Sequence, residues 1–156
     1  MKPTVEQSDF IEHMGRWWEV GTGSRSAGRI LGWLMICQPV HQSAADLVAA
    51  LSISTGSVST QIRFLEELQF VERITFPGDR STYFQLRPDV WLHVMGTEPD
   101  HLKRMMAISE AGADVVPEER PERVTDIGLI AGFMLGKWPS FMEELRDHIE
   151  KERQND

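Results

Sequence analysis

Apolar residues recur at helical spacing over most of the chain, and one short region in the middle alternates in the manner of β-strands. Capping patterns mark several helix starts, with a Thr or Ser followed three residues later by Gln, Asp or Glu. Together these signals predict helices over about residues 5–21, 24–37, 44–51, 54–68, 100–116 and 122–138, and a last helix that begins at Ser140. Strands are predicted over residues 70–76 and 81–86. The pattern therefore predicts a mainly α protein with a small β-hairpin.

The hairpin and the two helices before it form one recognisable unit. Pro77-Gly78-Asp79-Arg80 separates the two predicted strands, and a Pro-Gly pair is a strong turn signal. A short capped helix, a tight connection, a second capped helix and the hairpin follow one another from Ser43 to Leu86. This order predicts a helix-turn-helix followed by a wing.

The second helix of this motif has two different faces. One side is predicted to pack inward and carries Val58, Ile62, Leu65 and Leu68. The opposite side carries small polar residues and then a cation. A helix that enters a major groove about 12 Å wide needs slim residues at its leading end and a long cation further along. The alternative is that the Ser and Thr residues only cap the helix, as Ser54 does, but exposed helix positions more often carry Glu, Lys or Gln. The DNA contacts predicted on this helix are Ser54, Thr55, Gly56, Ser57, Ser59, Thr60 and Arg63.

Four segments carry a resemblance to a known family: residues 27–32 (AGRILG), 44–59 (AADLVAALSISTGSVS), 65–71 (LEELQFV) and 77–84, with Pro-Gly-Asp-Arg followed by Tyr83-Phe84. Over about residues 8–95 the chain resembles the GbsR branch of the MarR-type transcriptional regulators. The resemblance implies a winged-helix dimer whose interface is formed by the terminal helices of both chains. It also implies a recognition helix at residues 54–68 and a wing whose Arg80 reaches the minor groove or its phosphates.

The wing departs from the broad MarR pattern in one respect. That pattern has one residue between the wing Asp and Arg, whereas Asp79 and Arg80 are adjacent in this chain. The alternative role for Arg80 is an ion pair with Asp79 within the turn, which would contribute little stability in water. The DNA contacts predicted on the wing are Gly78, Asp79, Arg80 and Ser81.

The formal net charge of −8 is unevenly distributed and does not exclude DNA binding. Residues 24–95 hold six basic and six acidic residues, whereas residues 96–156 hold eight basic and fourteen acidic residues. Residues 24–63 contain three basic residues, Arg25, Arg29 and Arg63, and one acidic residue, Asp46. Local charge decides where phosphate binds, so the acidic C-terminal third leaves the central motif free to bind DNA.

The C-terminal third is interpreted as an assembly surface. Gly128, Gly132 and Gly136 recur every four residues, and glycine inside a helix costs about 1 kcal/mol relative to alanine. Close approach by a helix of a second chain explains that cost, and packing on the same domain is the alternative. The predicted division is therefore an N-terminal dimerisation helix at 1–23, a winged helix-turn-helix domain at 24–95 and a C-terminal dimerisation region at 96–156.

Five tryptophans suggest a ligand site. The resemblance points to regulators whose relatives respond to choline-like cations, which aromatic cages bind through cation–π attraction. Tryptophan also fills cores and interfaces generally, so a core role is the alternative. We expect a small apolar or cationic effector where the first two helices meet the segment after the hairpin. The predicted ligand-binding residues are Trp17, Trp18, Trp33 and Trp91.

Catalytic and metal chemistry find little support in the sequence. The five histidines are scattered without a pair four residues apart, and the single cysteine, Cys37, lies in an apolar run typical of a buried thiol. We expect no enzyme, no metal and no cofactor, and a cytoplasmic protein with no signal peptide and no membrane span. A sequence-specific regulator, most simply a repressor that acts as a homodimer on double-stranded DNA, is the predicted function. A winged helix used for protein contacts and a ligand-binding helical protein without DNA binding stay open as alternatives.

Overall fold

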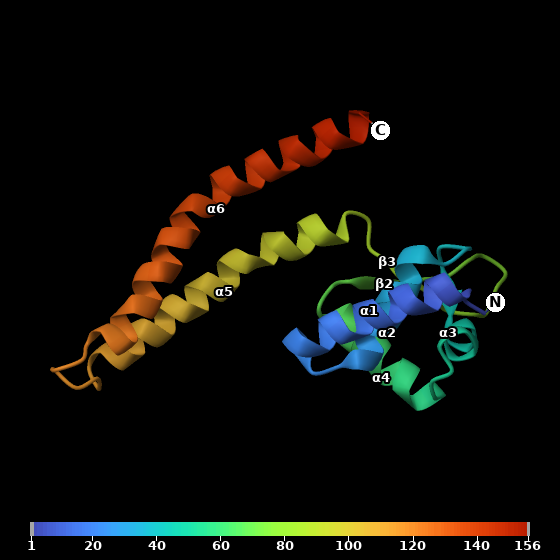
Figure 1. The fold of residues 1–156 in the computed structure, drawn as a ribbon, viewed down its shortest axis with the longest axis horizontal. Coiled ribbons are helices and arrows are strands. Elements are labelled where there is room, and N and C mark those ends of the chain that lie inside the picture. Colours follow the sequence, from blue (N-terminus) through green and yellow to red (C-terminus); the bar gives the residue numbers. More distant parts are fainter. Residues whose placement is uncertain (1, 156) are drawn as a thin grey trace. The chain divides into compact units, whose positions relative to one another are not determined.

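The chain forms two compact units, Met1–Val90 and Trp91–Asp156, and the computed structural model describes residues 2–155 (Figure 1). The first unit contains α1 (Val5–Thr22), α2 (Arg25–Ile36), β1 (Gln42–Ser43), α3 (Ala44–Leu51), α4 (Thr55–Glu67), β2 (Val71–Ile74) and β3 (Tyr83–Leu86). The helix α5 (Val90–Ala113) leads into the second unit, which is completed by α6 (Glu122–Asn155). The predicted fold class, mainly α with a small hairpin wing, is confirmed.

The helices α1 and α2 pack at unusually short range because glycine occupies their crossing. A Cβ built on Gly28 would lie 2.5 Å from Trp18 Cβ and 2.7 Å from the carbonyl oxygen of Met14. Real Cβ atoms do not approach backbone that closely, so a larger residue at position 28 would push the two helices apart. The glycines in the run at residues 27–32 are therefore explained by packing within one chain.

The core of the first unit lies between α2, α3, α4 and the sheet. Trp33 and Leu47 are almost completely buried, as are the inward positions of α4. Gln42 is the buried polar residue of β1, and its side chain accepts a hydrogen bond from Trp33 Nε1 (3.1 Å) and donates one to the carbonyl of Pro39 (2.8 Å). A buried polar group is costly unless it is hydrogen-bonded, and Gln42 satisfies this condition while it anchors β1 to α2.

The sheet has three antiparallel strands in the order β1-β3-β2. The two hairpin strands are shorter than predicted because pairing in β2 and β3 runs only from Val71 opposite Leu86 to Ile74 opposite Tyr83. The strand β1 was not predicted, since its two residues carry no local periodicity and exist as a strand only through pairing with Tyr83 and Phe84.

In the second unit, two predicted boundaries are wrong, and proline is the reason in each case. The sequence predicts a helix start after Pro99, but α5 begins at Val90 and contains Pro99. It also predicts separate helices before and after Pro139, but α6 continues through Pro139, and its ribbon bends near the middle of the helix (Figure 1). Proline removes one backbone hydrogen bond and costs about 3 kcal/mol inside a helix, and here packing of α5 on α6 overrides that cost.

Candidate nucleic-acid interface

The helix-turn-helix is built by two capped helices joined by a short turn. Ser43 caps α3 in a capping box with Asp46, and Ser52 closes α3 in the left-handed conformation with φ 53°. Ser54 then caps α4, because its side chain accepts a hydrogen bond from the backbone N–H of Ser57 (3.2 Å). Each cap satisfies backbone groups that the helix end would leave unpaired, so the start of α4 is set by local sequence.

Packing fixes which face of α4 points outward. Val58, Ile62 and Leu65 are 0%, 2% and 0% exposed, so this side of the helix is sealed against the core. The prediction that Leu68 also packs inward is wrong: it is 41% exposed, because it stands at the C-cap where α4 ends. The opposite side presents the residues predicted to contact DNA, all of them exposed except Ser57, which is half-buried: Ser54, Thr55, Gly56, Ser57, Ser59, Thr60 and Arg63. Within residues 2–155, no side chain pairs with Thr60 or Arg63, so these two side chains are available to a partner.

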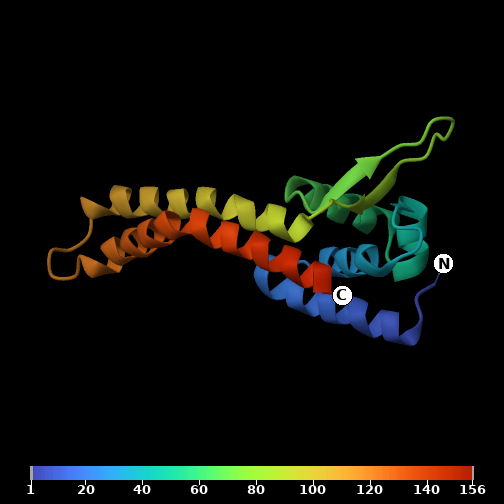
Figure 2. The ribbon, with the colours of Figure 1, turned by 90° about the horizontal axis from the view of Figure 1, so that it is seen from above.

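The wing projects from the first unit beyond its helices (Figure 2). Its tip is a tight turn in which Asp79 N donates to the carbonyl of Phe76 (3.1 Å) and Gly78 has φ +83°. A type II turn requires a residue with positive φ after proline, and Gly78 follows Pro77 for that reason. The predicted wing residues Gly78, Asp79, Arg80 and Ser81 are all exposed at this tip.

Asp79 is held inside the wing and does not pair with its neighbour Arg80. Its carboxylate accepts hydrogen bonds from the Tyr83 hydroxyl (2.7 Å) and from the backbone N–H of Ser81 (2.8 Å). These bonds, with the Tyr83 bond the larger cause, lower the pKa of Asp79, and the same carboxylate raises the pKa of Tyr83. Among the described residues, no acidic group lies within ion-pair distance of Arg80, so the alternative of a turn ion pair is not supported.

An aromatic cluster that sequence reasoning missed supports the base of the wing. His41, Phe76 and Tyr83 form three mutual ring contacts with centroids 4.8, 5.2 and 5.4 Å apart. His41 precedes β1, whereas the other two residues flank the wing loop. The cluster joins the wing to the segment that precedes the helix-turn-helix. Sequence reasoning could have found it only by predicting that β1 pairs with β3, because this pairing brings the segment of His41 next to Tyr83.

Several cations that the sequence counted for the interface are already occupied. Arg25 Nη2 and Arg29 Nε lie 2.6 and 2.7 Å from the carboxylate of Glu12, whose pKa is lowered mainly by its hydrogen bond with Arg25. Arg29 Nη2 also donates a hydrogen bond to the carbonyl of Leu51 (2.9 Å), so this guanidinium is held at two points. Arg73 forms two hydrogen bonds with Glu66 (2.9 and 2.8 Å). The unpaired cations of α4 and the wing are therefore Arg63 and Arg80.

The four tryptophans predicted to bind a ligand differ in their surroundings. Trp33 is 1% exposed and belongs to the core, and Trp18 is 5% exposed and meets Phe70 edge-on with centroids 4.7 Å apart. Trp17 and Trp91 are 60% and 42% exposed, and Trp91 belongs to the second unit. Burial of Trp33 matches the core alternative, whereas Trp17 and Trp18 line a surface cavity of about 370 Å³ at the end of α1.

The glycines predicted at the dimer interface lie differently along α6. A Cβ on Gly128 would lie 2.5 Å from Ser109 Oγ, and a Cβ on Gly132 would lie 3.8 Å from Met106 Cε, so both glycines face α5 of the same chain. A Cβ on Gly136 would meet nothing within 4 Å. At Gly128, the close helix approach is therefore made by α5 of the same chain, which agrees with the alternative of packing within one domain.

The single cysteine and the possible metal ligands add little reactive chemistry in the part of the chain that is described. Cys37 is buried, and burial raises the pKa of its thiol. Residues 2–155 contain no cluster of three or more side chains suited to hold a metal ion. None of their helices combines the length and the apolar character needed to cross a membrane.

Comparison with known proteins places this geometry in a group of regulators. A scan against protein-family models finds no match. The chain is 35% identical over 133 residues to the HTH-type transcriptional regulator MmpR5 of Mycobacterium tuberculosis (strain ATCC 25618 / H37Rv), covering 81% of this chain and 78% of that protein. A crystal structure of a transcriptional regulator superposes with a TM-score of 0.80 at 30% identity, covering 91% of this chain and 99% of the other. AbsC, a MarR family transcriptional regulator from Streptomyces coelicolor, is a distant likeness with a TM-score of 0.43 at 21% identity, covering 85% and 89% of the two chains.

Proposed function

Because the chain belongs to the helix-turn-helix transcriptional regulators, we propose that it is a MarR-type regulator of the GbsR branch that binds double-stranded DNA as a homodimer. The observation that carries this proposal is the pair of unpaired arginines, Arg63 on α4 and Arg80 at the wing tip, on an otherwise small and polar surface. Duplex DNA offers two grooves, and a helix followed by a projecting hairpin addresses both of them.

The helix α4 is suited to read the major groove. Its leading residues Thr55, Gly56 and Ser59 are slim and exposed, so base edges can approach the helix backbone closely. Arg63 follows about two turns into the helix and is long enough to reach a phosphate or the acceptors of a guanine. The net charge of −8 does not oppose this arrangement, because the acidic excess lies in residues 96–156.

The wing supplies a contact of a different kind. Arg80 stands on a loop whose shape is held by the Asp79–Tyr83 bond, so its side chain is free while its backbone is fixed. A single arginine at the tip of a hairpin fits the minor groove or the phosphates at its edge. We propose that Arg80 contributes affinity for DNA in general, whereas the face of α4 contributes sequence preference.

Dimerisation is proposed through α6, where Gly136 leaves an open position and several large apolar side chains are exposed. Leu129, Ile130 and Phe133 are 69%, 56% and 70% exposed, and Phe141 beyond the bend is 44% exposed. Large apolar side chains clustered on one surface mark an interaction site in soluble proteins. A two-fold dimer would place two copies of α4 about one helical turn of DNA apart, roughly 34 Å, and would supply the affinity that one winged helix lacks.

We further propose that the protein represses transcription and that a small-molecule effector releases it. An effector changes DNA affinity only if it binds one arrangement of the dimer more tightly than another. The second unit joins the wing directly, since α5 begins four residues after the end of β3. A ligand that changes the conformation of the second unit would therefore act on α5, the helix that follows the wing.

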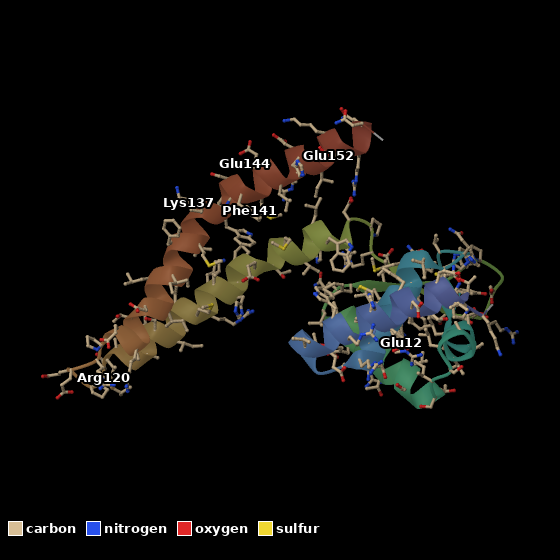
Figure 3. The ribbon with its side chains drawn as sticks, in the orientation of Figure 1. Glu12, Arg120, Lys137, Phe141, Glu144 and Glu152 are labelled. Atoms are coloured by element: carbon tan, nitrogen blue, oxygen red, sulfur yellow. The ribbon has the colours of Figure 1, made fainter. Side chains whose placement is uncertain are left out.

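The test is a gel-shift titration with the DNA upstream of the protein's own gene, repeated over a series of salt concentrations. Specific binding that weakens steeply with salt is expected, because displaced counterions drive phosphate contacts. The double change Arg63→Gln and Arg80→Gln should abolish the shift. The matched control is Arg120→Gln in the connection between α5 and α6 (Figure 3), which removes one exposed cation away from the motif and should leave the shift intact.

Two results would contradict the proposal. Equal binding by the double variant and the wild-type protein would remove α4 and the wing from the interface. Absence of salt-dependent binding to this DNA and to random duplexes would instead favour a winged helix that binds proteins, or a ligand-binding helical protein.

A further inference from the structure

The second unit contains a cavity between its two helices that the DNA-binding function does not use. It has a volume of about 430 Å³, and α5 and α6 both line it, with Gly96, Pro99 and Lys103 from α5 and Leu135, Trp138, Pro139, Met142 and Arg146 from α6. Ligand cavities in proteins commonly hold 300–1,000 Å³. The cavity lies where α6 bends, close to the labelled residues Lys137 and Phe141 (Figure 3).

Two prolines, Pro99 and Pro139, and the tryptophan Trp138 belong to the lining of this cavity. Pro99 has no N–H for the carbonyl four residues earlier, which belongs to Met95, and Trp138 Nε1 donates to that carbonyl instead (3.2 Å). Pro139, next to Trp138 in the sequence, likewise lacks a backbone N–H inside α6. The Trp138 ring is therefore held in place by a hydrogen bond at its nitrogen, and the rest of the side chain lines the cavity.

The lining combines an apolar floor with two cationic groups. Met142 is 5% exposed and Leu135 is half-buried, and these two side chains form the aliphatic part of the lining. The Lys103 ammonium lies 3.1 Å from Asp100, in a pair whose side chains are 61% and 70% exposed. Such an exposed pair is weak and exchanges readily with another carboxylate. Within residues 2–155, no acidic side chain lies within ion-pair distance of Arg146.

We propose that this cavity binds an amphipathic monocarboxylate whose aliphatic body contacts Trp138, Leu135 and Met142 and whose carboxylate meets Arg146 and Lys103. Guanidinium and carboxylate groups form charge-assisted, two-point hydrogen bonds, and the apolar body gains from leaving water. A choline-like cation is disfavoured here, because both charged groups of the lining are positive. Binding itself is independent of DNA, and only its use as the effector signal rests on the proposed function.

The experiment measures heats of binding to the full-length protein by isothermal titration, with decanoate as the probe below its micelle-forming concentration. Decanol and decyltrimethylammonium have the same chain with a neutral and a positive head, so they separate the contribution of charge from that of apolar burial. Saturable binding of decanoate is expected, with decanol at least about tenfold weaker and no saturable binding of the ammonium compound. Decanoate should also change the tryptophan emission, and this change should disappear in Trp138→Phe.

Variants locate the site within the second unit. Arg146→Gln should weaken decanoate binding about tenfold. Its matched control is Arg104→Gln, an exposed cation next to Lys103 that does not line the cavity and should bind decanoate normally. Gly96→Met should block binding by filling the space, and it should fold, since a Cβ on Gly96 meets nothing within 4 Å.

The proposal is overturned if no saturable decanoate binding occurs. Filling of the cavity by a second copy of the chain would give this result. The proposal is equally overturned if the ammonium compound binds as well as decanoate, or if Arg104→Gln weakens binding as much as Arg146→Gln does. Circular dichroism of each variant shows whether the helices are retained. The gel shift without any carboxylate tests the DNA-binding proposal separately, so failure of one leaves the other standing.

Discussion

The Tyr83 hydroxyl lies 2.7 Å from Asp79 Oδ2 and donates a hydrogen bond that closes the wing loop on its own strand. The aspartate is thereby engaged within the hairpin, and Arg80 is left as the free side chain of the tip. In this wing the adjacent Asp and Arg have separate tasks, since one shapes the loop and the other is available for DNA.

Tyr83→Phe is expected to weaken DNA binding without unfolding the protein. The change keeps the ring in its contact with His41 and Phe76 but removes the bond to Asp79, so the loop gains freedom that binding must then restrict. Gel shifts should show a loss of affinity on specific and random DNA that is smaller than the loss caused by Arg80→Ala. An unchanged affinity would show that the Asp79–Tyr83 bond does not position the wing for binding.

Arg80→Ala and Thr60→Ala should reduce DNA binding in different ways. Loss of Arg80 should weaken binding to all duplexes and lower the salt slope by about one unit, because one phosphate contact disappears. Loss of Thr60 should change sequence preference and cost about 1–3 kcal/mol at one base position. The measurement is a salt titration on the specific site, on single-base variants of it and on random DNA. Equal losses on all three by both variants would contradict this division of roles.

Phe133→Asp should convert the dimer to a monomer. Phe133 is 70% exposed, so the charged residue costs little in a single chain but is buried without a partner if α6 forms the interface. Sedimentation velocity should show monomer with unchanged helix content, and DNA affinity should fall steeply because two half-sites are no longer linked. The control is Glu119→Gln in the connection before α6, which removes a charge from an exposed position and should stay dimeric. A fully dimeric Phe133→Asp would remove this part of α6 from the interface.

Two glycines of α6 offer a matched pair that tests the packing of α5 on α6. Gly128→Ala places a Cβ 2.8 Å from Ser109 Cβ, so α5 and α6 must move apart and the protein should lose about 1–3 kcal/mol of stability. Gly136→Ala meets no atom within 4 Å and should gain up to about 1 kcal/mol from the higher helix propensity of alanine. Urea unfolding of both variants measures the difference. Similar effects at the two positions would mean that Gly128 does not lie against α5.

The capping box of α3 should make part of the stability dependent on pH. Asp46 accepts hydrogen bonds from the Ser43 hydroxyl (2.6 Å) and backbone N–H (2.9 Å), and these bonds lower its pKa. Since the folded pKa lies below the unfolded value of about 3.9, the contribution is complete above that value and is lost as pH falls through the folded pKa. Asp46→Asn should therefore cost about 1 kcal/mol near pH 7 and progressively less below about pH 4.

The control for this effect is Asp114→Asn, which makes the same change of charge at an exposed residue. Thermal unfolding of both variants between pH 7 and pH 3 is the measurement. A difference between wild type and Asp46→Asn that stays constant over this range would exclude the ionised carboxylate as the cause.

Local sequence alone determined the helix-turn-helix and most of its predicted contact surface. Capping by Ser43 and Ser54 and the inward row at Val58, Ile62 and Leu65 act over a few residues, so they can be interpreted without the rest of the fold. The turn at Pro77-Gly78 is local for the same reason, because its geometry depends on the φ values of two residues.

Only the tertiary structure decided which groups these elements bring together. The strand β1 exists through pairing with β3, and the cations Arg25 and Arg29 are occupied by a glutamate on another helix. Likewise, α5 and α6 continue through Pro99 and Pro139 because contacts between the helices, including the indole of Trp138 at the carbonyl of Met95, override the local cost of proline. Local free energies of about 1–3 kcal/mol are readable from sequence, but they are outweighed wherever packing between distant segments contributes more.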